Sequence, residues 1–298
     1  MRSMTRRIGV AVVAAATVLF GAACGVGSQS GAEGKVDVVV SVNQWKSLAS
    51  EIGGDKAEVT SILANQNVEA HDFEPQPSDI AKLTTAKVVV VNGADYDSWA
   101  TKAMQNASGV AVVNAAKAGG ISAGQNPHTW FSASVRKATA KAYLAQLKKA
   151  APDDSHYFDE QYAAWQKKEA SLDEATAAVK KETGGVAYGA TESVAYYLAK
   201  DLGMKDATPT GYAQAVENES EPAPGDIKTF QGKLENGDIK LLIVNDQEKN
   251  STATMIEKTA KASKVPIVHL SESMPSKYTS LVTWVEALVD DFEKTSAH

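Results

Sequence analysis

Residues 152–183, PDDSHYFDEQYAAWQKKEASLDEATAAVKKET, decide how this chain is organised. A proline followed by two aspartates and a serine is typical of a helix start. Apolar residues then recur at helical spacing from Phe158 to Val179, and two glycines end the pattern. About 28 helical residues extend roughly 42 Å, which is longer than most single domains require. We therefore predict a spine helix, residues 151–184, that ties two lobes together.

Residues 36–150, before the spine, alternate between β-branched runs and helical patterns. The run from Val36 to Val42 is typical of a strand buried in a parallel sheet. Strands that alternate with helices indicate an open α/β sheet with helices on both faces. The predicted strands are 36–42, 58–63, 87–93 and 110–114, and the predicted helices are 43–52, 78–85, 96–106 and 134–150.

Residues 185–298, after the spine, repeat this alternation without a close sequence repeat. The predicted strands are 186–190, 240–245 and 265–270, and the predicted helices are 193–202, 222–234, 252–263 and 280–295. The predicted fold class is therefore α/β, with two Rossmann-like lobes containing parallel sheets and joined by one long spine helix.

The first 23 residues have the features of a secretory signal peptide. Three arginines precede an apolar run, residues 8–20, and small residues lead to Cys24. The run is too short for a comfortable membrane span. Cys24 is the only cysteine of the chain, so an intrachain disulfide is excluded.

The stretch from Leu19 to Cys24 resembles a bacterial lipoprotein signal, although Gly21 stands where leucine is usual. This resemblance implies cleavage before Cys24 and attachment of lipid to it, which would anchor the protein to the outer face of the bacterial cytoplasmic membrane. The alternative is an ordinary signal peptide with an incidental cysteine. In the lipoprotein interpretation, residues 24–35 hold the lipidated cysteine and a flexible, Gly/Ser-rich tether.

The charge of the chain argues against nucleic acid as a partner. The formal net charge is −6, and removing a leader with three arginines and no acidic residue makes it −9. Nucleic-acid-binding domains are usually basic. An acidic body is compatible with a cation as ligand.

Four groups of possible metal ligands follow predicted strands, where ligands of open α/β sheets bind. They are His71, His128, Glu192 and the turn Asn245-Asp246-Gln247-Glu248. Two imidazoles with one or two carboxylates suit Zn²⁺ or Mn²⁺. Each has an alternative role, because a loop histidine can be a surface residue or a hydrogen-bonding partner, and Glu192 can cap the helix that follows it.

Three motifs resemble the TroA-like metal-binding solute proteins of ABC transporters. They are HDFEPQPSD at 71–79, NGADYDSW at 92–99 and NPHTW at 126–130. The resemblance covers essentially the whole mature chain and implies His71, His128 and Glu192 as ligands. The third of these positions is glutamate in manganese-type members and often histidine in zinc-type members.

The fourth ligand is where this sequence departs from the resemblance. The family often has an aspartate shortly after a strand, and our alignment of the strand 240–245 places Lys249 there. Asp246 is the preferred substitute because it lies nearest the strand end. Glu248 and water are the alternatives.

The resemblance implies a carrier and not an enzyme. We expect a monomer that captures one divalent transition metal ion, Zn²⁺ or Mn²⁺, between its lobes and delivers it to an ABC transporter permease, with small lobe movements because of the spine. A surface zinc-dependent hydrolase is the first alternative, although no His-Glu-x-x-His motif is present. A surface adhesin is the second alternative.

Overall fold

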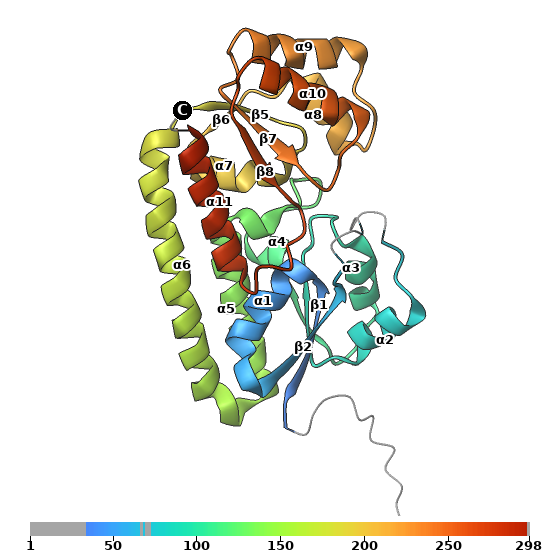
Figure 1. The fold of residues 1–298 in the computed structure, drawn as a ribbon. Helices are drawn as coiled ribbons and strands as arrows, with labels where there is room; N and C mark the ends of the chain where they lie inside the picture. Colours follow the sequence, from blue (N-terminus) through green and yellow to red (C-terminus); the bar gives the residue numbers. More distant parts are fainter. Residues whose placement is uncertain (1–33, 66–67, 69–72, 297–298) are drawn as a thin grey trace, which may run out of the picture.

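A computed structural model describes residues 34–65, 68 and 73–296. A long helix, α6 (Ser155–Thr183), runs along one side of the molecule and reaches both lobes (Figure 1). Its 29 residues correspond to about 44 Å. A short 3-10 turn, η3 (Pro152–Asp154), precedes it. The predicted spine helix is confirmed.

The lobe before α6 is built on a parallel sheet with the strand order β2-β1-β3-β4. The strand β1 lies inside the sheet, with Val38 opposite Val59 of β2 and Val88 of β3. Valines dominate β1 and β3 and are buried, as expected where helices cover both faces. The elements are β1 (Val36–Val42), α1 (Asn43–Gly53), η1 (Gly54–Lys56), β2 (Ala57–Leu63), α2 (Pro77–Thr85), β3 (Val88–Val91), α3 (Ser98–Gln105), β4 (Ala111–Asn114), α4 (Ala115–Ala118), η2 (Thr129–Phe131) and α5 (Ala133–Ala150).

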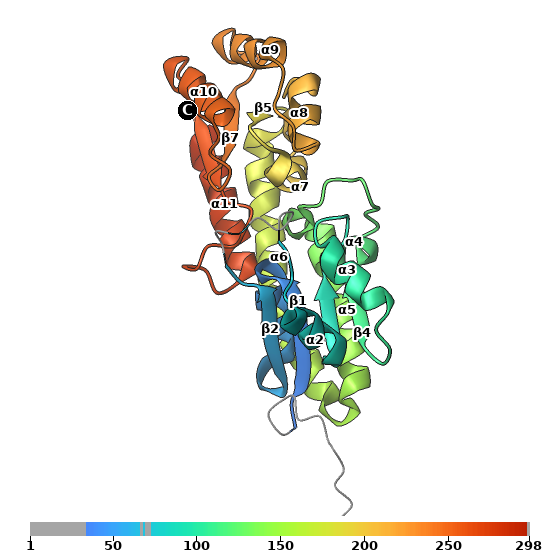
Figure 2. The same ribbon diagram turned by 90° about the vertical axis from the view of Figure 1, so that its right-hand side faces the viewer.

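The lobe after α6 has a sheet of the same parallel topology, with the order β6-β5-β7-β8. In each lobe the first strand lies inside the sheet, between the second and the third strand of that lobe. Figure 2 shows the two lobes stacked along the spine. The predicted fold class is confirmed. The elements are β5 (Ala187–Ala190), η4 (Ser193–Ala195), α7 (Tyr196–Asp201), β6 (Lys205–Asp206), α8 (Thr210–Glu217), α9 (Pro224–Glu235), β7 (Leu241–Asn245), α10 (Ser251–Ala262) and β8 (Ile267–Leu270).

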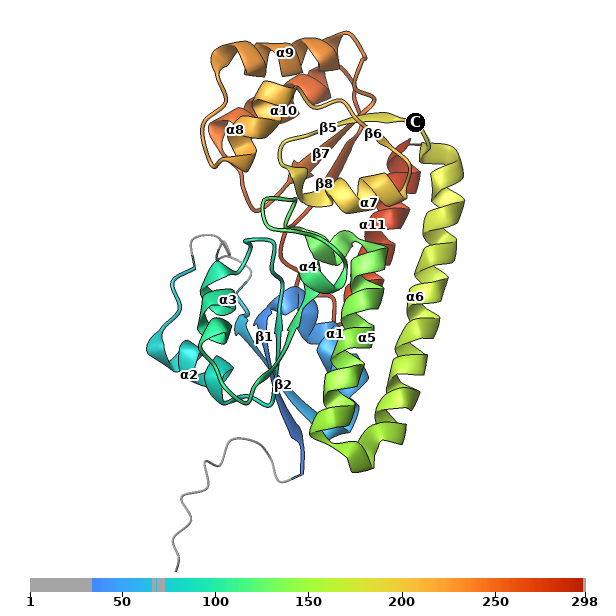
Figure 3. The ribbon, with the colours of Figure 1, turned by 180° about the vertical axis from the view of Figure 1, so that it is seen from behind.

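The last helix, α11 (Leu281–Ser296), returns from the second sheet and packs beside α6 (Figure 3). Its Trp284 contacts Phe131 of the first lobe, with ring centroids 5.1 Å apart. The backbone N–H of Leu281 donates to Ser47 Oγ of α1 at 2.8 Å. One cluster of buried apolar side chains is continuous through both lobes. The helix α11 is therefore a second connection that opposes wide hinge motion.

Two elements of the second lobe were not predicted. The strand β6 has two exposed residues, so it carries no apolar pattern. The helix α8 has Tyr212 as its one buried residue, which is too little for a periodic signal. In the described part of the chain, no helix combines the length and the apolar character needed to cross a bilayer.

Candidate metal centre

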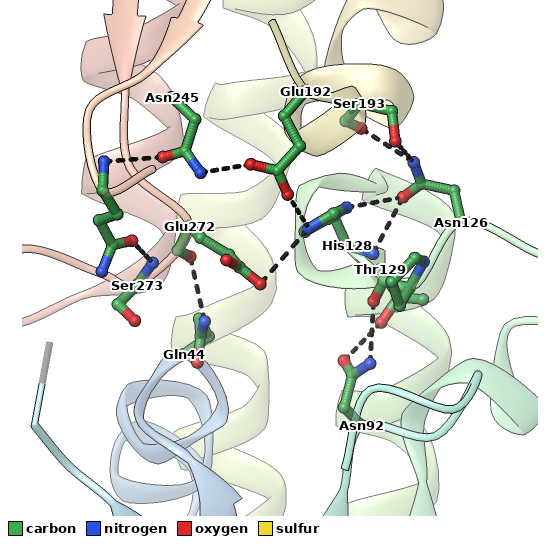
Figure 4. A network of polar contacts seen from close by, with 12 residues as sticks. Gln44, Asn92, Asn126, His128, Thr129, Glu192, Ser193, Asn245, Glu272 and Ser273 are labelled. Carbon is green, nitrogen blue, oxygen red and sulfur yellow. Dashed lines mark hydrogen bonds and ion pairs between the residues drawn. The ribbon is translucent and has the colours of Figure 1, made fainter. Parts of the chain in front are cut away.

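Three acidic or imidazole side chains converge where the strand ends of the two lobes face each other (Figure 4). One ligand atom from each of His128, Glu192 and Glu272 lies within 4.8 Å of the others. The Nε2 atom of His128 is 3.4 Å from Glu272 Oε1 and 3.8 Å from Glu192 Oε1. The three side chains are 4%, 16% and 3% exposed, so water screens their charges weakly.

The orientation of His128 is determined by Asn126. Its Oδ1 accepts the backbone N–H of His128 at 3.0 Å and lies 3.1 Å from ring Nδ1. An amide oxygen can only accept, so Nδ1 carries the proton of the neutral ring and Nε2 keeps its lone pair. That lone pair faces two carboxylates, an arrangement that requires a cation or protons among the three groups.

The loop that carries His128 is held by Asn92, which follows β3. Asn92 Nδ2 donates to the carbonyl of Pro127 at 2.9 Å, and its Oδ1 accepts from Thr129 Oγ1 at 2.8 Å. Asp97 in turn accepts the backbone N–H of Asn92 at 2.6 Å. Residues 92–99 therefore support the histidine loop, and their contribution is structural.

A buried ion pair ties the same loop to the spine. Arg136 of α5 donates through Nη2 to Glu169 of α6 at 2.7 Å and through Nη1 to the carbonyl of Trp130 at 3.1 Å. Both charged side chains are almost fully buried. The ring of Trp130 stands edge-on to His128, with centroids 5.5 Å apart. Packing and hydrogen bonds therefore limit how far the imidazole can turn.

Glu192 extends from the second lobe two residues after the end of β5. Its Oε2 accepts a hydrogen bond from Asn245 Nδ2 at 2.6 Å, and it makes no capping hydrogen bond to the helix that follows. The alternative of a helix cap is therefore wrong. Burial raises the pKa of the Glu192 carboxyl well above its usual range, and the nearby carboxylates of Glu272 and Glu248 raise it further. A divalent cation would relieve both effects.

Glu272 follows β8 and was not among the predicted ligands. Helix α1 of the first lobe holds its backbone, because Gln44 Nε2 donates to the Glu272 carbonyl at 3.0 Å. Gln247 Oε1 accepts the backbone N–H of Ser273 at 2.6 Å. The signal in the sequence was an acidic residue just beyond the predicted strand 265–270, at a carboxyl end of the sheet.

The comparison with known proteins identifies the family. The chain matches the family described as ZnuA, zinc-uptake complex component A, periplasmic, over residues 38–295. The chain belongs to this family. The predicted resemblance to TroA-like proteins is thereby confirmed.

Relatives in this family include the metal ABC transporter substrate-binding lipoprotein FimA of Streptococcus parasanguinis, which is 29% identical over 268 residues, 84% of each chain. The manganese ABC transporter substrate-binding lipoprotein PsaA of Streptococcus pneumoniae is 28% identical over 269 residues, again 84% of each. Among solved structures, laminin binding protein (Lmb) of Streptococcus agalactiae, described as having adhesin and metal transporting activity, has a TM-score of 0.73 at 22% identity. It matches 88% of this chain and 99% of its own, which shows the shared fold.

The remaining predicted site residues are placed as follows in this member of the ZnuA family. His71 and Cys24 lie outside the described residues. Asp246 is not brought to the group: its side chain is 42% exposed and pairs with Lys249 and His269, each at 3.0 Å. Burial raises the pKa of Asp246, but these hydrogen bonds and charges outweigh it, and the pKa is lowered overall. The structure therefore offers Glu272 where the sequence favoured Asp246.

Proposed function

We propose that this chain is the substrate-binding component of an ABC uptake system and carries one divalent transition metal ion, Zn²⁺ or Mn²⁺, between its two lobes. The observation that carries the proposal is the buried His128 Nε2 facing two carboxylates at 3.4 and 3.8 Å. A cation at their centre replaces repulsion by three favourable contacts. The metal-related names of FimA and PsaA support the same function.

The proposed ligands are His71, His128, Glu192 and Glu272. His71 enters from the sequence, since it follows the predicted strand 58–63 and belongs to the motif shared with the family. Two nitrogen and two oxygen donors suit both Zn²⁺ and Mn²⁺. Glu272 replaces Asp246 in the proposed set because it lies within reach of His128 and Asp246 is already paired.

The site binds by substituting protein atoms for water around the ion. Imidazole and carboxylate groups are already oriented, by Asn126 for His128 and by Asn245 for Glu192, so little ordering is needed when metal enters. Because four side chains fill a tetrahedral shell, none of its positions is left for an activated water. This is why we favour a carrier over a hydrolase.

The location and partner follow from the proposed function. We infer that Cys24 is lipidated after removal of residues 1–23, and that the tether 24–35 holds a monomeric body at the outer face of the bacterial cytoplasmic membrane. A membrane permease would receive the metal from the closed form. The two helices that connect the lobes favour small closing movements.

Metal retention by the soluble body, residues 25–298, tests the proposal. The protein is stripped with a chelator, exposed to equal Zn²⁺ and Mn²⁺, desalted and measured by elemental analysis. We expect about one metal per chain for the wild type and for His156→Ala, whose histidine is 87% exposed. We expect little metal in His128→Ala. Equal retention by the two variants, or none by the wild type, would contradict the proposed site.

A further inference from the structure

The side chain of Asn126 bridges the two lobes at the proposed metal centre. Its Nδ2 donates to the backbone carbonyl of Ser193 at 2.9 Å and meets Ser193 Oγ at 2.8 Å. Its Oδ1 faces the backbone N–H and ring Nδ1 of His128. Figure 4 shows the amide between the two residues. One planar group therefore contacts the histidine of the first lobe and the start of η4 in the second.

The orientation of this amide is determined by its partners. The Ser193 carbonyl can only accept a hydrogen bond, and the His128 backbone N–H can only donate one. A flipped amide would therefore place donor against donor and acceptor against acceptor. The same two contacts that set the amide also set the tautomer of His128, because Oδ1 must face an Nδ1–H.

Ser193 is adjacent in sequence to Glu192, which supplies a carboxylate from the second lobe. A shift of η4 away from the first lobe would break the contacts of Asn126 and withdraw Glu192 from His128. The hydroxyl of Tyr197 also donates to the backbone carbonyl of Asn126 at 2.9 Å, so this part of the interface contains several aligned contacts. The side chain of Asn126 thus takes part both in orienting His128 and in the contact between the lobes.

We propose that Asn126 is a positioning residue that couples contact between the lobes to the orientation of His128, so that breaking the Asn126–Ser193 contact speeds metal release. The inference rests on the proposed metal-carrying function. It differs from a loop-building role for Asn126, because a turn within residues 126–128 alone would not make metal release depend on Ser193.

The Asn126 amide accepts from His128 and donates to Ser193, and substitutions can separate these two contacts. Asn126→Ala removes both the acceptor for His128 and the donor for Ser193. Ser193→Ala leaves the acceptor, the ring and the Ser193 carbonyl in place and removes one contact. Asp201→Ala is the matched control, because it removes a different hydrogen bond between the lobes, the one that the backbone N–H of Ala133 donates to Asp201 Oδ2 at 3.2 Å.

The test measures zinc release from the soluble body, residues 25–298, into an excess of chromophoric chelator. We expect release about 10- to 100-fold faster in Asn126→Ala, as for other partners of ligating histidines, and about 2- to 10-fold faster in Ser193→Ala. The double variant should release zinc at the rate of Asn126→Ala, since without the Asn126 amide the Ser193 hydroxyl has lost the group that it contacts. Asp201→Ala should stay within about twofold of the wild type.

Additive effects in the double variant, or wild-type release from Ser193→Ala, would overturn the coupling. Nitrogen NMR of the metal-free protein gives a second readout: His128 should be the Nδ1–H tautomer in the wild type and a mixture in Asn126→Ala. An unchanged tautomer would overturn the positioning role. A wild type that binds no zinc would contradict the proposed function instead, and the tautomer measurement would still decide the role of Asn126.

Discussion

Replacing Glu272 by glutamine should stabilise the metal-free protein and weaken metal binding. Glu272 and Glu192 place carboxylate oxygens within 4.8 Å of each other in a buried site. At an effective dielectric constant of about 20, two such charges repel by about 3 kcal/mol. Glutamine keeps the shape of the side chain and removes this repulsion, so we expect a gain of about 1–3 kcal/mol in the free energy of unfolding at a pH where both carboxyls are ionised. That corresponds to a melting temperature about 2–10 °C higher.

The assay is thermal unfolding in excess chelator and again in saturating zinc. Because glutamine supplies no charge to the metal, the stabilisation caused by zinc should shrink, with affinity reduced by about 100-fold or more. Asp246→Asn is the matched control: Asp246 pairs with Lys249 and His269 and its pKa is lowered, so its loss should slightly destabilise the protein and leave the zinc effect intact. A lower melting temperature for metal-free Glu272→Gln, with an unchanged zinc effect, would refute the reasoning.

Two further predictions concern pH and the spine. The raised pKa of Glu192 means that the folded metal-free protein binds a proton more tightly than the unfolded chain. Glu192 should therefore destabilise the metal-free protein as pH rises above 4.5, the ordinary pKa of this carboxyl. A pH series of urea unfolding in chelator should show this loss in the wild type and not in Glu192→Gln, and the same pH dependence in both proteins would contradict it. Glu169→Gln should cost about 3–5 kcal/mol in the free energy of unfolding because it leaves the buried Arg136 without its counter-charge. Lys137 forms a neighbouring exposed ion pair with Asp173. Lys137→Ala breaks this pair and should lower the free energy of unfolding by less than about 1 kcal/mol in the same urea assay.

The helices and strands with strong periodic patterns were predictable, and those without one were not. The predicted spine, residues 151–184, corresponds to α6 at Ser155–Thr183 because apolar spacing and the terminal glycines mark a helix locally. The strand β6 escaped prediction, since two exposed residues become a strand only by pairing with β5. Pairing between distant segments of this kind produces no pattern in the local sequence.

The candidate site divides in the same way. His128 and Glu192 were predicted because each follows a strand or belongs to a motif, and the structure brings them together. Asp246 was preferred because it lies beside the end of the strand 240–245, but its side chain pairs on the exposed side with Lys249 and His269. Proximity to a strand end narrows the choice of residues and does not say which way a side chain points.

The sequence by itself determined the two-lobe α/β organisation, the spine and the loop motif at 126–130 that carries His128. These features depend on the local spacing of apolar residues, glycines and prolines. The tertiary structure alone decided which acid faces His128. Glu272 reaches it because helix α1 of the first lobe holds the backbone of a segment that follows the last strand of the second. Such a contact joins distant parts of the chain, and its energy comes from packing and hydrogen bonds that form only when both lobes have folded.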